Sequence, residues 1–285
     1  MLWKNRFSQS IQLAVTLILV GIELASPPLV MSNSSEESDR QNNSPSDQTT
    51  LNFQPPNRGA PGTRADAGSR GGSGQCSKLE KPITALIPTT NWGETIAAHP
   101  TFWLYIPTSS AATVELVLKP EGSDDVLYEV KFPVTQGPGI VSFRPPETAP
   151  PLEEGKAYRW MFNFYCSSEV LNASTRSNIQ SNFTVSGIVA RVAPSRALKQ
   201  QLEKAGLTEK LNLYAENGLW YETLTQLAER RRTDPQNSEV ADQWMDLLQH
   251  KAVLLNNIAQ EPILACCQLE PKNTLSLPFK QKGAN

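Results

Sequence analysis

The sequence predicts an α+β fold in which an antiparallel β-sandwich is followed by a short helical region. Three observations support this prediction. Apolar and polar positions alternate with a period of two between residues 83 and 192. After Pro194 the apolar positions recur at helical spacing, and Pro and Gly pairs separate the shorter apolar segments. Short strands without intervening helices, followed by a run of helices, are typical of this class.

The first 25 residues predict a signal peptide. Lys4 and Arg6 precede an apolar run over 11–22, and Glu23 closes the run. A basic start followed by about 7–15 apolar residues is the pattern of a secretory signal, whereas a spanning helix needs about 20. We therefore expect export to the periplasm, the envelope or the medium. A membrane association is expected only if this segment stays uncleaved.

Residues 26–75 predict a disordered tether. Ser, Asn, Gly and Pro dominate this segment and apolar residues are few. Such a composition buries too little apolar surface to offset the entropy lost on ordering. Its last part is rich in glycine and ends at Cys76, but it lacks the Lys-Ser/Thr ending of a phosphate-binding loop. We interpret it as a loop held by Cys76.

The segment 76–193 predicts the sandwich. In residues 125–133, Val126, Tyr128, Val130 and Phe132 fall on one face, which is typical of a half-buried strand. Strands of this kind at short spacing favour two packed sheets. The predicted strands are 83–88, 101–107, 113–119, 125–133, 139–144, 157–166 and 183–192.

A local motif narrows the kind of sandwich. Leu152, Gly155 and Tyr158 form an L-x-x-G-x-x-Y pattern before the sixth strand. This pattern resembles the tyrosine corner of immunoglobulin-like and fibronectin type III domains, in which the tyrosine hydroxyl bonds to upstream backbone. The same face of the strand is expected to lie in the core, and it carries Trp160, Phe162, Phe164 and Cys166.

The segment 194–265 predicts helices over 195–205, from Thr208 onward, over 219–232 and over 238–260. Part of it resembles a single tetratricopeptide motif, although Arg230 stands where a small residue is usual. One such motif is too few for a solenoid, so we expect a helical hairpin that packs on the sandwich or on a neighbour. The matching positions are Tyr214, Gly218, Trp220, Leu227 and Pro235.

The chain has four cysteines, Cys76, Cys166, Cys266 and Cys267, which an exported protein is expected to oxidise. They allow three pairings. We favour Cys76 with Cys166, because this bond would hold the glycine-rich loop against the sixth strand. The adjacent Cys266 and Cys267 are expected in a flexible tail, 266–285, where they could form a strained, reducible bridge that acts as a redox switch, a structural bridge, free buried thiols or cross-links to other chains.

Composition and motifs exclude several functions. The net charge of -2 gives no basis for a nucleic-acid partner. The two histidines, His99 and His250, have no triad companions, and no cysteine pair has zinc-finger spacing. We therefore predict no catalytic, cofactor-binding or metal-binding residues, and no enzyme.

Several sequence segments resemble the cyanobacterial family known as domain of unknown function 928. They are GTRADAGSRGGSGQC (62–76), HPTFWLYIP (99–107), GIVSF (139–143), PLEEGKAYRWMFNFYC (151–166) and YAENGLWYETLTQLAERR (214–231). The resemblance implies an exported envelope protein and supplies no catalytic residues. The Ala65-Asp66 interruption of the glycine-rich motif weakens any role for that loop.

The leading functional hypothesis is a non-enzymatic envelope or secreted module that binds another protein. One alternative is a glycan-binding sandwich, which would need exposed aromatic rings. Another alternative is a thiol-disulfide factor that uses Cys266 and Cys267. The candidate binding surface comprises Trp92, Trp103, Tyr105, Trp220 and Tyr221.

Overall fold

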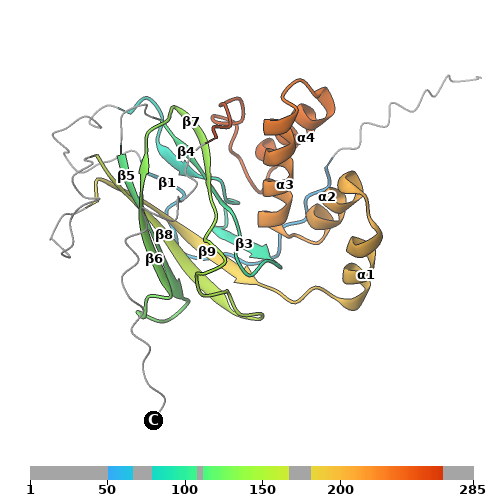
Figure 1. The fold of residues 1–285 in the computed structure, drawn as a ribbon. Coiled ribbons are helices and arrows are strands. Elements are labelled where there is room, and N and C mark those ends of the chain that lie inside the picture. The colour runs from blue at the N-terminus through green and yellow to red at the C-terminus, as the bar shows by residue number, and fades with distance from the viewer. Residues whose placement is uncertain (1–50, 67–78, 108–111, 167–180, 266–285) are drawn as a thin grey trace, which may run out of the picture. The chain divides into compact units, whose positions relative to one another are not determined.

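The computed structural model describes residues 51–66, 79–107, 112–166 and 181–265, and Figure 1 shows two β-sheets and a group of helices. All described residues belong to one compact unit, Asp47–Asn285. The predicted α+β class is confirmed. The strands are β1 (Ala65–Asp66), β2 (Ile83–Ala85), β3 (Trp92–Thr95), β4 (Phe102–Ile106), β5 (Ala112–Pro120), β6 (Tyr128–Val134), β7 (Gly139–Phe143), β8 (Ala157–Tyr165) and β9 (Phe183–Arg191).

The strands form two sheets. One sheet has the order β1-β2-β4-β7 and the other has the order β3-β9-β8-β5-β6. Every pairing between neighbouring strands is antiparallel except β3 with β9, which run parallel with Trp92 opposite Ile188. Past the edge strand β7, Ile140 forms a parallel bridge with Ile263, so the end of the helical region covers that edge within the described residues.

The alternation of β8 places one face in the core, as predicted. Tyr158, Trp160, Phe162 and Phe164 are buried, whereas Arg159, Met161 and Asn163 between them are only half-buried. The backbone N–H of Glu153 donates a hydrogen bond to the Tyr158 hydroxyl over 3.0 Å. The L-x-x-G-x-x-Y motif therefore ties the start of β8 to the backbone that precedes it, which is the local contact that the motif predicts.

The strand predictions differ from the structure in four places, and the first is that the strand predicted over 83–88 ends at Ala85. Strands β1 and β3 were not expected, because two and four residues are too few to show alternation. The strand predicted from residue 125 begins only at Tyr128, and Val126 is exposed. Gly122 with a φ of 79° and the turn around it occupy the preceding segment.

Four helices occur in the described residues: α1 (Arg196–Lys204), α2 (Leu207–Glu216), α3 (Trp220–Thr233) and α4 (Ser238–Gln249). The second helix, expected from Thr208 onward, begins at Leu207, and Gly206 rather than Thr208 occupies its N-cap position. The prediction of a helix to residue 260 is also wrong. His250 ends α4, and Leu254 takes a φ of 52°, which interrupts a helix. Turns follow there instead, although Leu255 and Ile258 remain buried.

Helix α3 packs against the sandwich. Its Trp220 donates from Nε1 to the Leu86 carbonyl oxygen over 3.0 Å. Its Tyr221 hydroxyl accepts from Trp160 Nε1 over 2.9 Å, and the Tyr221 ring lies edge-on to Phe102, 5.5 Å between centroids. The buried residues of the sheets and of the helices thus form one continuous hydrophobic core. The helical region packs on the sandwich, which was one of the two expected arrangements.

Residues 51–66, which we name the N-terminal strap, depart from the predicted tether. Leu51 and Phe53 are buried, and the Phe53 ring lies edge-on to Trp220 at 5.2 Å. The Gln54 N–H donates to the Ala215 carbonyl oxygen, while the Thr63 carbonyl oxygen accepts from the Ser186 N–H of β9 and the Thr63 N–H donates to the Ser186 hydroxyl. Two apolar side chains and paired backbone groups therefore order this segment despite its polar composition. The rest of the predicted tether lies outside the described residues.

Among the cysteines, the described residues include only Cys166, directly after β8, and its thiol is not free. Cys76, Cys266 and Cys267 lie outside the described residues. The pairing of Cys76 with Cys166 therefore stays a prediction. The predicted signal peptide and the tail 266–285 lie outside the described residues as well.

Candidate functional site

A pocket of about 270 Å³ lies where the sandwich meets the helices. The connection from β3 to β4 forms one wall, and helices α2 and α3 form the other. Arg144, just after β7, lies at the same pocket. Polar lining residues from the helices are Tyr214, Glu222, Thr225 and Gln226. Because both parts of the fold line it, the pocket depends on the packing of α3 against the sandwich.

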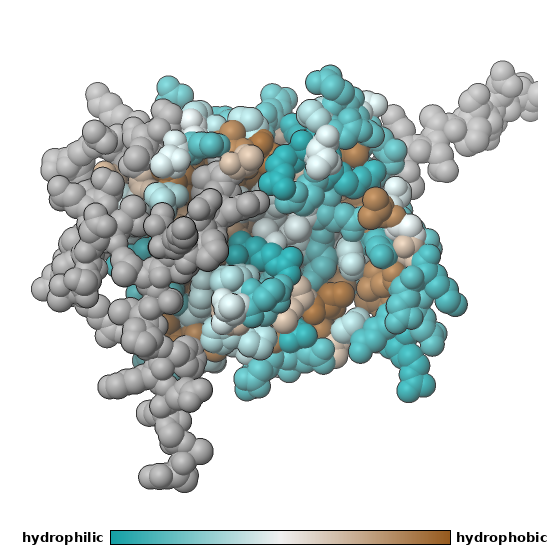
Figure 2. Space-filling view, viewed as in Figure 1, coloured by the Kyte–Doolittle hydropathy of each residue, from teal (hydrophilic) through white to brown (hydrophobic). Residues whose placement is uncertain are grey.

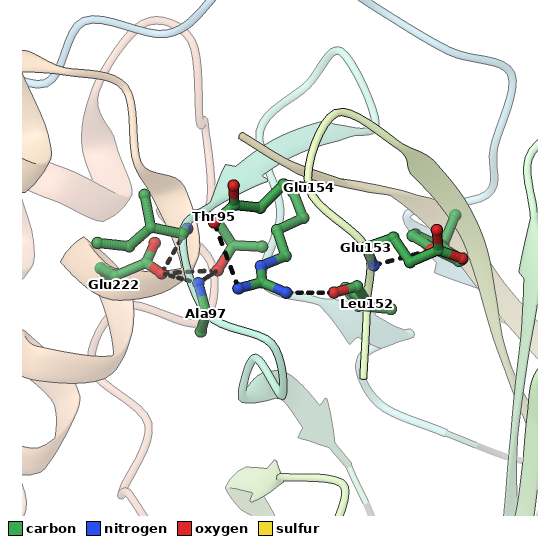
Figure 3. A network of polar contacts seen from close by, with 9 residues as sticks. Thr95, Ala97, Leu152, Glu153, Glu154 and Glu222 are labelled. Atoms are coloured by element: carbon green, nitrogen blue, oxygen red, sulfur yellow. Dashed lines mark hydrogen bonds and ion pairs between the residues drawn. The ribbon is translucent and has the colours of Figure 1, made fainter. Parts of the chain in front are cut away.

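Glu222 joins the two walls. It lies in the first turn of α3, where a negative charge complements the helix dipole. Its Oε1 accepts hydrogen bonds from the Thr95 hydroxyl at 2.6 Å, the Ile96 N–H at 2.9 Å and the Ala97 N–H at 3.1 Å. Figure 3 shows this carboxylate facing Thr95 and Ala97. The three donors fix the side chain in one orientation.

The second oxygen of Glu222 differs from the first. Oε2 is buried and has no hydrogen-bond partner among the described residues. Burial raises the pKa of Glu222, and the three hydrogen bonds to Oε1 oppose this shift. Burial and, to a smaller extent, the nearby charge of Glu222 raise the pKa of the Tyr214 hydroxyl. Glu222 thus holds the pocket wall through one oxygen, while its other oxygen is enclosed by the protein.

His99 forms a second polar group on the sandwich side of the pocket. Its ring is buried, with Nε2 2.9 Å from the Ala149 carbonyl oxygen and Nδ1 3.1 Å from Oε2 of Glu147. Arg144 donates to the other oxygen of Glu147 over 2.9 Å. Both ring nitrogens therefore already face oxygen atoms, and His99 holds the pocket wall in place.

A neighbouring network in Figure 3 supports this wall. Arg191, at the end of β9, donates to the Leu152 carbonyl oxygen and lies 3.6 Å from Glu154. The N–H of Glu153 is held by Tyr158. These contacts fix the loop before β8, and the Leu152 N–H in turn donates to the Ala98 carbonyl oxygen. The loop and the pocket wall therefore form one rigid assembly.

Four of the five aromatic residues that were predicted to form a binding surface are buried. Trp103, Tyr105, Trp220 and Tyr221 are at most 4% exposed. Only Trp92 is half-buried, and Arg58 lies over its ring at 5.7 Å. Of the five, only Tyr221 lines the pocket. The prediction of a binding surface from these rings is therefore wrong, because their aromatic and apolar character belongs to the shared core of sheet and helix.

Glu222 was the residue that sequence reasoning missed. A lone glutamate in the first turn of a helix is normally solvated, and nothing in the spacing around it marks it as buried. The signal that could have found it is its position directly after Trp220 and Tyr221, which are the residues that pack on the sandwich. A charge next to two packed aromatic residues must lie at the edge of the interface.

The exposed apolar residues do not offer a broader interface. Figure 2 shows separate brown areas among hydrophilic residues on the displayed face. The large hydrophobic side chains exposed in the described residues are Val126, Leu207 and Leu254, which come from distant parts of the sequence. Scattered exposed apolar residues are usual on protein surfaces. The pocket is therefore the better candidate for specific recognition.

Within the described ranges, no three His, Cys, Asp or Glu side chains cluster closely enough to hold a metal ion. No helix in these same ranges has the length and apolar character needed to cross a membrane.

Comparisons with known proteins identify one family. The model of the family described as Domain of Unknown Function (DUF928) matches residues 65–263. This range covers β1 to β9 and α1 to α4, and it includes all the residues named in the pocket. Searches of curated proteins and of solved structures gave no match.

Proposed function

We propose that this chain, which belongs to the DUF928 family, is an exported, non-enzymatic module that binds a protein partner in the cell envelope or outside the cell. The observation that carries the proposal is the pocket between sandwich and helices, which Glu222 and His99 line with polar groups held in fixed positions.

The geometry of the pocket favours binding over catalysis. A general base needs a free lone pair within reach of a substrate proton. The lone pairs of Glu222 Oε1 face three donors, its Oε2 is enclosed by the protein, and both nitrogens of His99 face oxygen atoms. These groups are arranged to hold a rigid wall, which lowers the entropy cost of recognition.

The strand order supports the finer assignment of an immunoglobulin-like or fibronectin type III-like sandwich. The succession β9-β8-β5-β6 matches the G-F-C-C′ order, and β2-β4-β7 matches A-B-E. Tyr158, at the start of the strand that corresponds to F, bonds to the upstream backbone as a tyrosine corner does. Many extracellular domains of this architecture bind proteins, which supports the proposal by analogy of fold. Helices α2 and α3, which follow each other after a three-residue connection and pack together, support a single tetratricopeptide-like hairpin.

The proposal of export rests on the predicted signal peptide over 1–25. The proposal of a cyanobacterial source rests on the family resemblance. In an oxidising compartment we expect the Cys76–Cys166 bond. This bond would attach the segment before β2 to the end of β8.

The glycan-binding alternative loses its basis, because sugar stacking needs open ring faces and four of the five candidate rings are buried. The thiol-disulfide alternative depends on Cys266 and Cys267, which lie outside the described residues. It predicts that the double replacement of both cysteines by serine abolishes function in cells.

A photo-crosslinking experiment tests the proposal. A benzoylphenylalanine at Arg144, whose exposed side chain lies at the pocket, is introduced into the full chain in cells that export it. We expect a discrete adduct with a protein. The same amino acid at Glu203, an exposed position on α1, is the control. An adduct of equal yield at both positions, or none at either, would contradict the proposal.

A further inference from the structure

We infer that the pocket receives a tyrosine side chain of the protein partner, with its ring against the apolar walls and its hydroxyl at the hydroxyls of Thr101 and Tyr214. This inference rests on the proposed function, because it names the side chain by which a protein partner would be recognised. A small free phenol offers the same chemistry, and the experiment below separates the two sources.

Two hydroxyls at the pocket are open to a ligand. Thr101 and Tyr214 both line the pocket and are half-buried. Their hydroxyls have no hydrogen-bond partner in the described part of the chain, and neither oxygen is among the unpartnered polar atoms that the fold encloses. Each hydroxyl can therefore both donate to and accept from a group that enters the pocket.

The fold turns both hydroxyls toward the space between the two walls. Trp103 of β4 donates from Nε1 to the Thr225 hydroxyl of α3 over 3.0 Å. Thr101 precedes Trp103 by two residues in the same extended segment, so its side chain also lies on the side that faces α3. After burial, the charge of Glu222 on α3 is the cause that raises the pKa of Tyr214. The Tyr214 hydroxyl therefore lies near that carboxylate, on the pocket side of α2.

The charges at the pocket are already matched, which favours a neutral ligand. Arg144 pairs with Glu147 over 2.9 Å, and Glu147 also lies 3.1 Å from Nδ1 of His99. Glu222 accepts three hydrogen bonds on one oxygen, and the protein encloses its other oxygen. A charged ligand would lose hydration without gaining a free counter-charge, and an unpaired charge is costly to bury.

The walls suit one aromatic ring. Ala97, Pro100 and the ring of Tyr214 supply apolar surface. The Arg144 side chain is 59% exposed, and its planar guanidinium can cover a ring with its face while its edge pairs with Glu147. The volume of about 270 Å³ lies below the roughly 300–1,000 Å³ of pockets for drug-sized ligands. This size favours a single side chain of the partner.

Among side chains with a ring, tyrosine matches the two hydroxyls best. Phenylalanine would displace water from Thr101 and Tyr214 and offer them no hydrogen bond in return. An indole N–H only donates, whereas a phenol hydroxyl both donates and accepts. Tyrosine is also enriched among the residues that carry most of the binding energy at protein interfaces.

The test is a titration of the full chain at neutral pH, followed by NMR through the amide signals of Thr101 and Thr225. The probes are p-cresol, toluene, benzylammonium and benzoate, which share one ring and differ in hydroxyl and charge. We expect saturable shifts with p-cresol and weaker binding of the other three. Toluene should bind about 2- to 10-fold more weakly than p-cresol, the range for loss of a neutral hydrogen bond.

A double variant tests the two hydroxyls directly. T101V/Y214F breaks no hydrogen bond within the described residues, so it should fold, and it should bind p-cresol about 2- to 10-fold more weakly. Y128F is the matched control, because Tyr128 is a half-buried tyrosine of β6 that does not line the pocket. This control should bind p-cresol as the unchanged chain does.

Two peptide probes separate the sources of the phenol. Acetyl-tyrosine methylamide carries the phenol on a peptide backbone, and acetyl-phenylalanine methylamide lacks the hydroxyl. We expect the tyrosine probe to bind at least as tightly as p-cresol and more tightly than the phenylalanine probe. Binding of p-cresol without binding of the tyrosine probe would assign the pocket to a small phenol and overturn the inference. Equal binding of toluene and p-cresol, tighter binding of either charged probe, or unchanged p-cresol binding in T101V/Y214F would overturn it as well.

These outcomes are distinct from a failure of the proposed function. If p-cresol and the tyrosine probe bind as expected but no protein crosslinks at Arg144, the protein-binding function fails, and with it the tyrosine of a partner as the ligand. If the crosslink at Arg144 forms with equal yield in the T101V/Y214F chain, the function stands and the tyrosine inference fails.

Discussion

Replacement of Glu222 by alanine should destabilise the fold far more than replacement of a solvated glutamate in the first turn of a helix would. The change removes Oε1, which accepts from the Thr95 hydroxyl and from the N–H groups of Ile96 and Ala97. A buried donor left without an acceptor costs about 1–3 kcal/mol. Thr95 is fully buried, whereas Ile96 and Ala97 are half-buried and can recruit water. We therefore expect a net loss of about 2–4 kcal/mol.

Glutamine at the same position separates the hydrogen bonds from the charge. E222Q keeps an oxygen for the three donors and removes the charge whose burial raises the pKa of Glu222. Since the folded pKa lies above the unfolded one, wild-type stability falls as pH rises from about 4.3, the unfolded value, through the raised folded value. E222Q has no such loss. Its stability relative to wild type should therefore be higher at neutral pH than in acid.

Urea unfolding of wild type, E222A, E222Q and E229A at neutral and acidic pH measures these effects. E229A is the matched control, because Glu229 lies on the same helix in a partly exposed pair with Arg232, and such pairs contribute about 0–1 kcal/mol. The reasoning is refuted if E222A loses less than about 1 kcal/mol, which is the lower limit for one orphaned donor. It is also refuted if E222Q is as destabilised as E222A.

Three further predictions concern the shared core and the disulfide. Tyr221→Phe removes the acceptor of the Trp160 N–H and should cost about 1–3 kcal/mol in urea unfolding; an unchanged midpoint would contradict this. Gly93→Ala places a Cβ about 2.8 Å from the Tyr221 ring. We expect this clash to cost about 1–3 kcal/mol and to lower the melting temperature. An unchanged melting temperature would mean that α3 can move away from β3. Peptide mapping of the exported protein without reduction should recover Cys76 linked to Cys166, and a different partner for Cys166 would exclude this pairing.

The sequence predicts those parts of the fold in which a local pattern reports burial. Tyr158 and the alternating residues after it lie in the core as expected, because a strand with one buried face must alternate. Strand β3 gave no such signal, since its Gly93 has no side chain and its pairing with β9 depends on residues far away in sequence. Local patterns cannot report a partner that tertiary packing supplies.

The same limit explains why the sequence did not predict the ordered strap or the pocket. The strap is polar on average, yet Leu51 and Phe53 pack it against the helices and Gln54 bonds to the backbone of α2. The aromatic rings of Trp220 and Tyr221 suggest a binding surface, but both rings are buried against the sandwich. The next residue, Glu222, is the polar group of α3 that bonds to the opposite wall of the pocket. The packing of α3 decides that Tyr221 and Glu222 line the pocket and Trp220 does not, and composition does not reveal this.

The most direct test of the account compares the crosslinking yield of benzoylphenylalanine at Arg144, which lies at the pocket, with the yield at Glu203 on α1 in the exported full chain. We predict a discrete protein adduct at Arg144 and none at Glu203. Adducts of equal yield at both positions would show that the pocket is not the contact surface. The absence of any adduct at Arg144 would contradict the binding function itself.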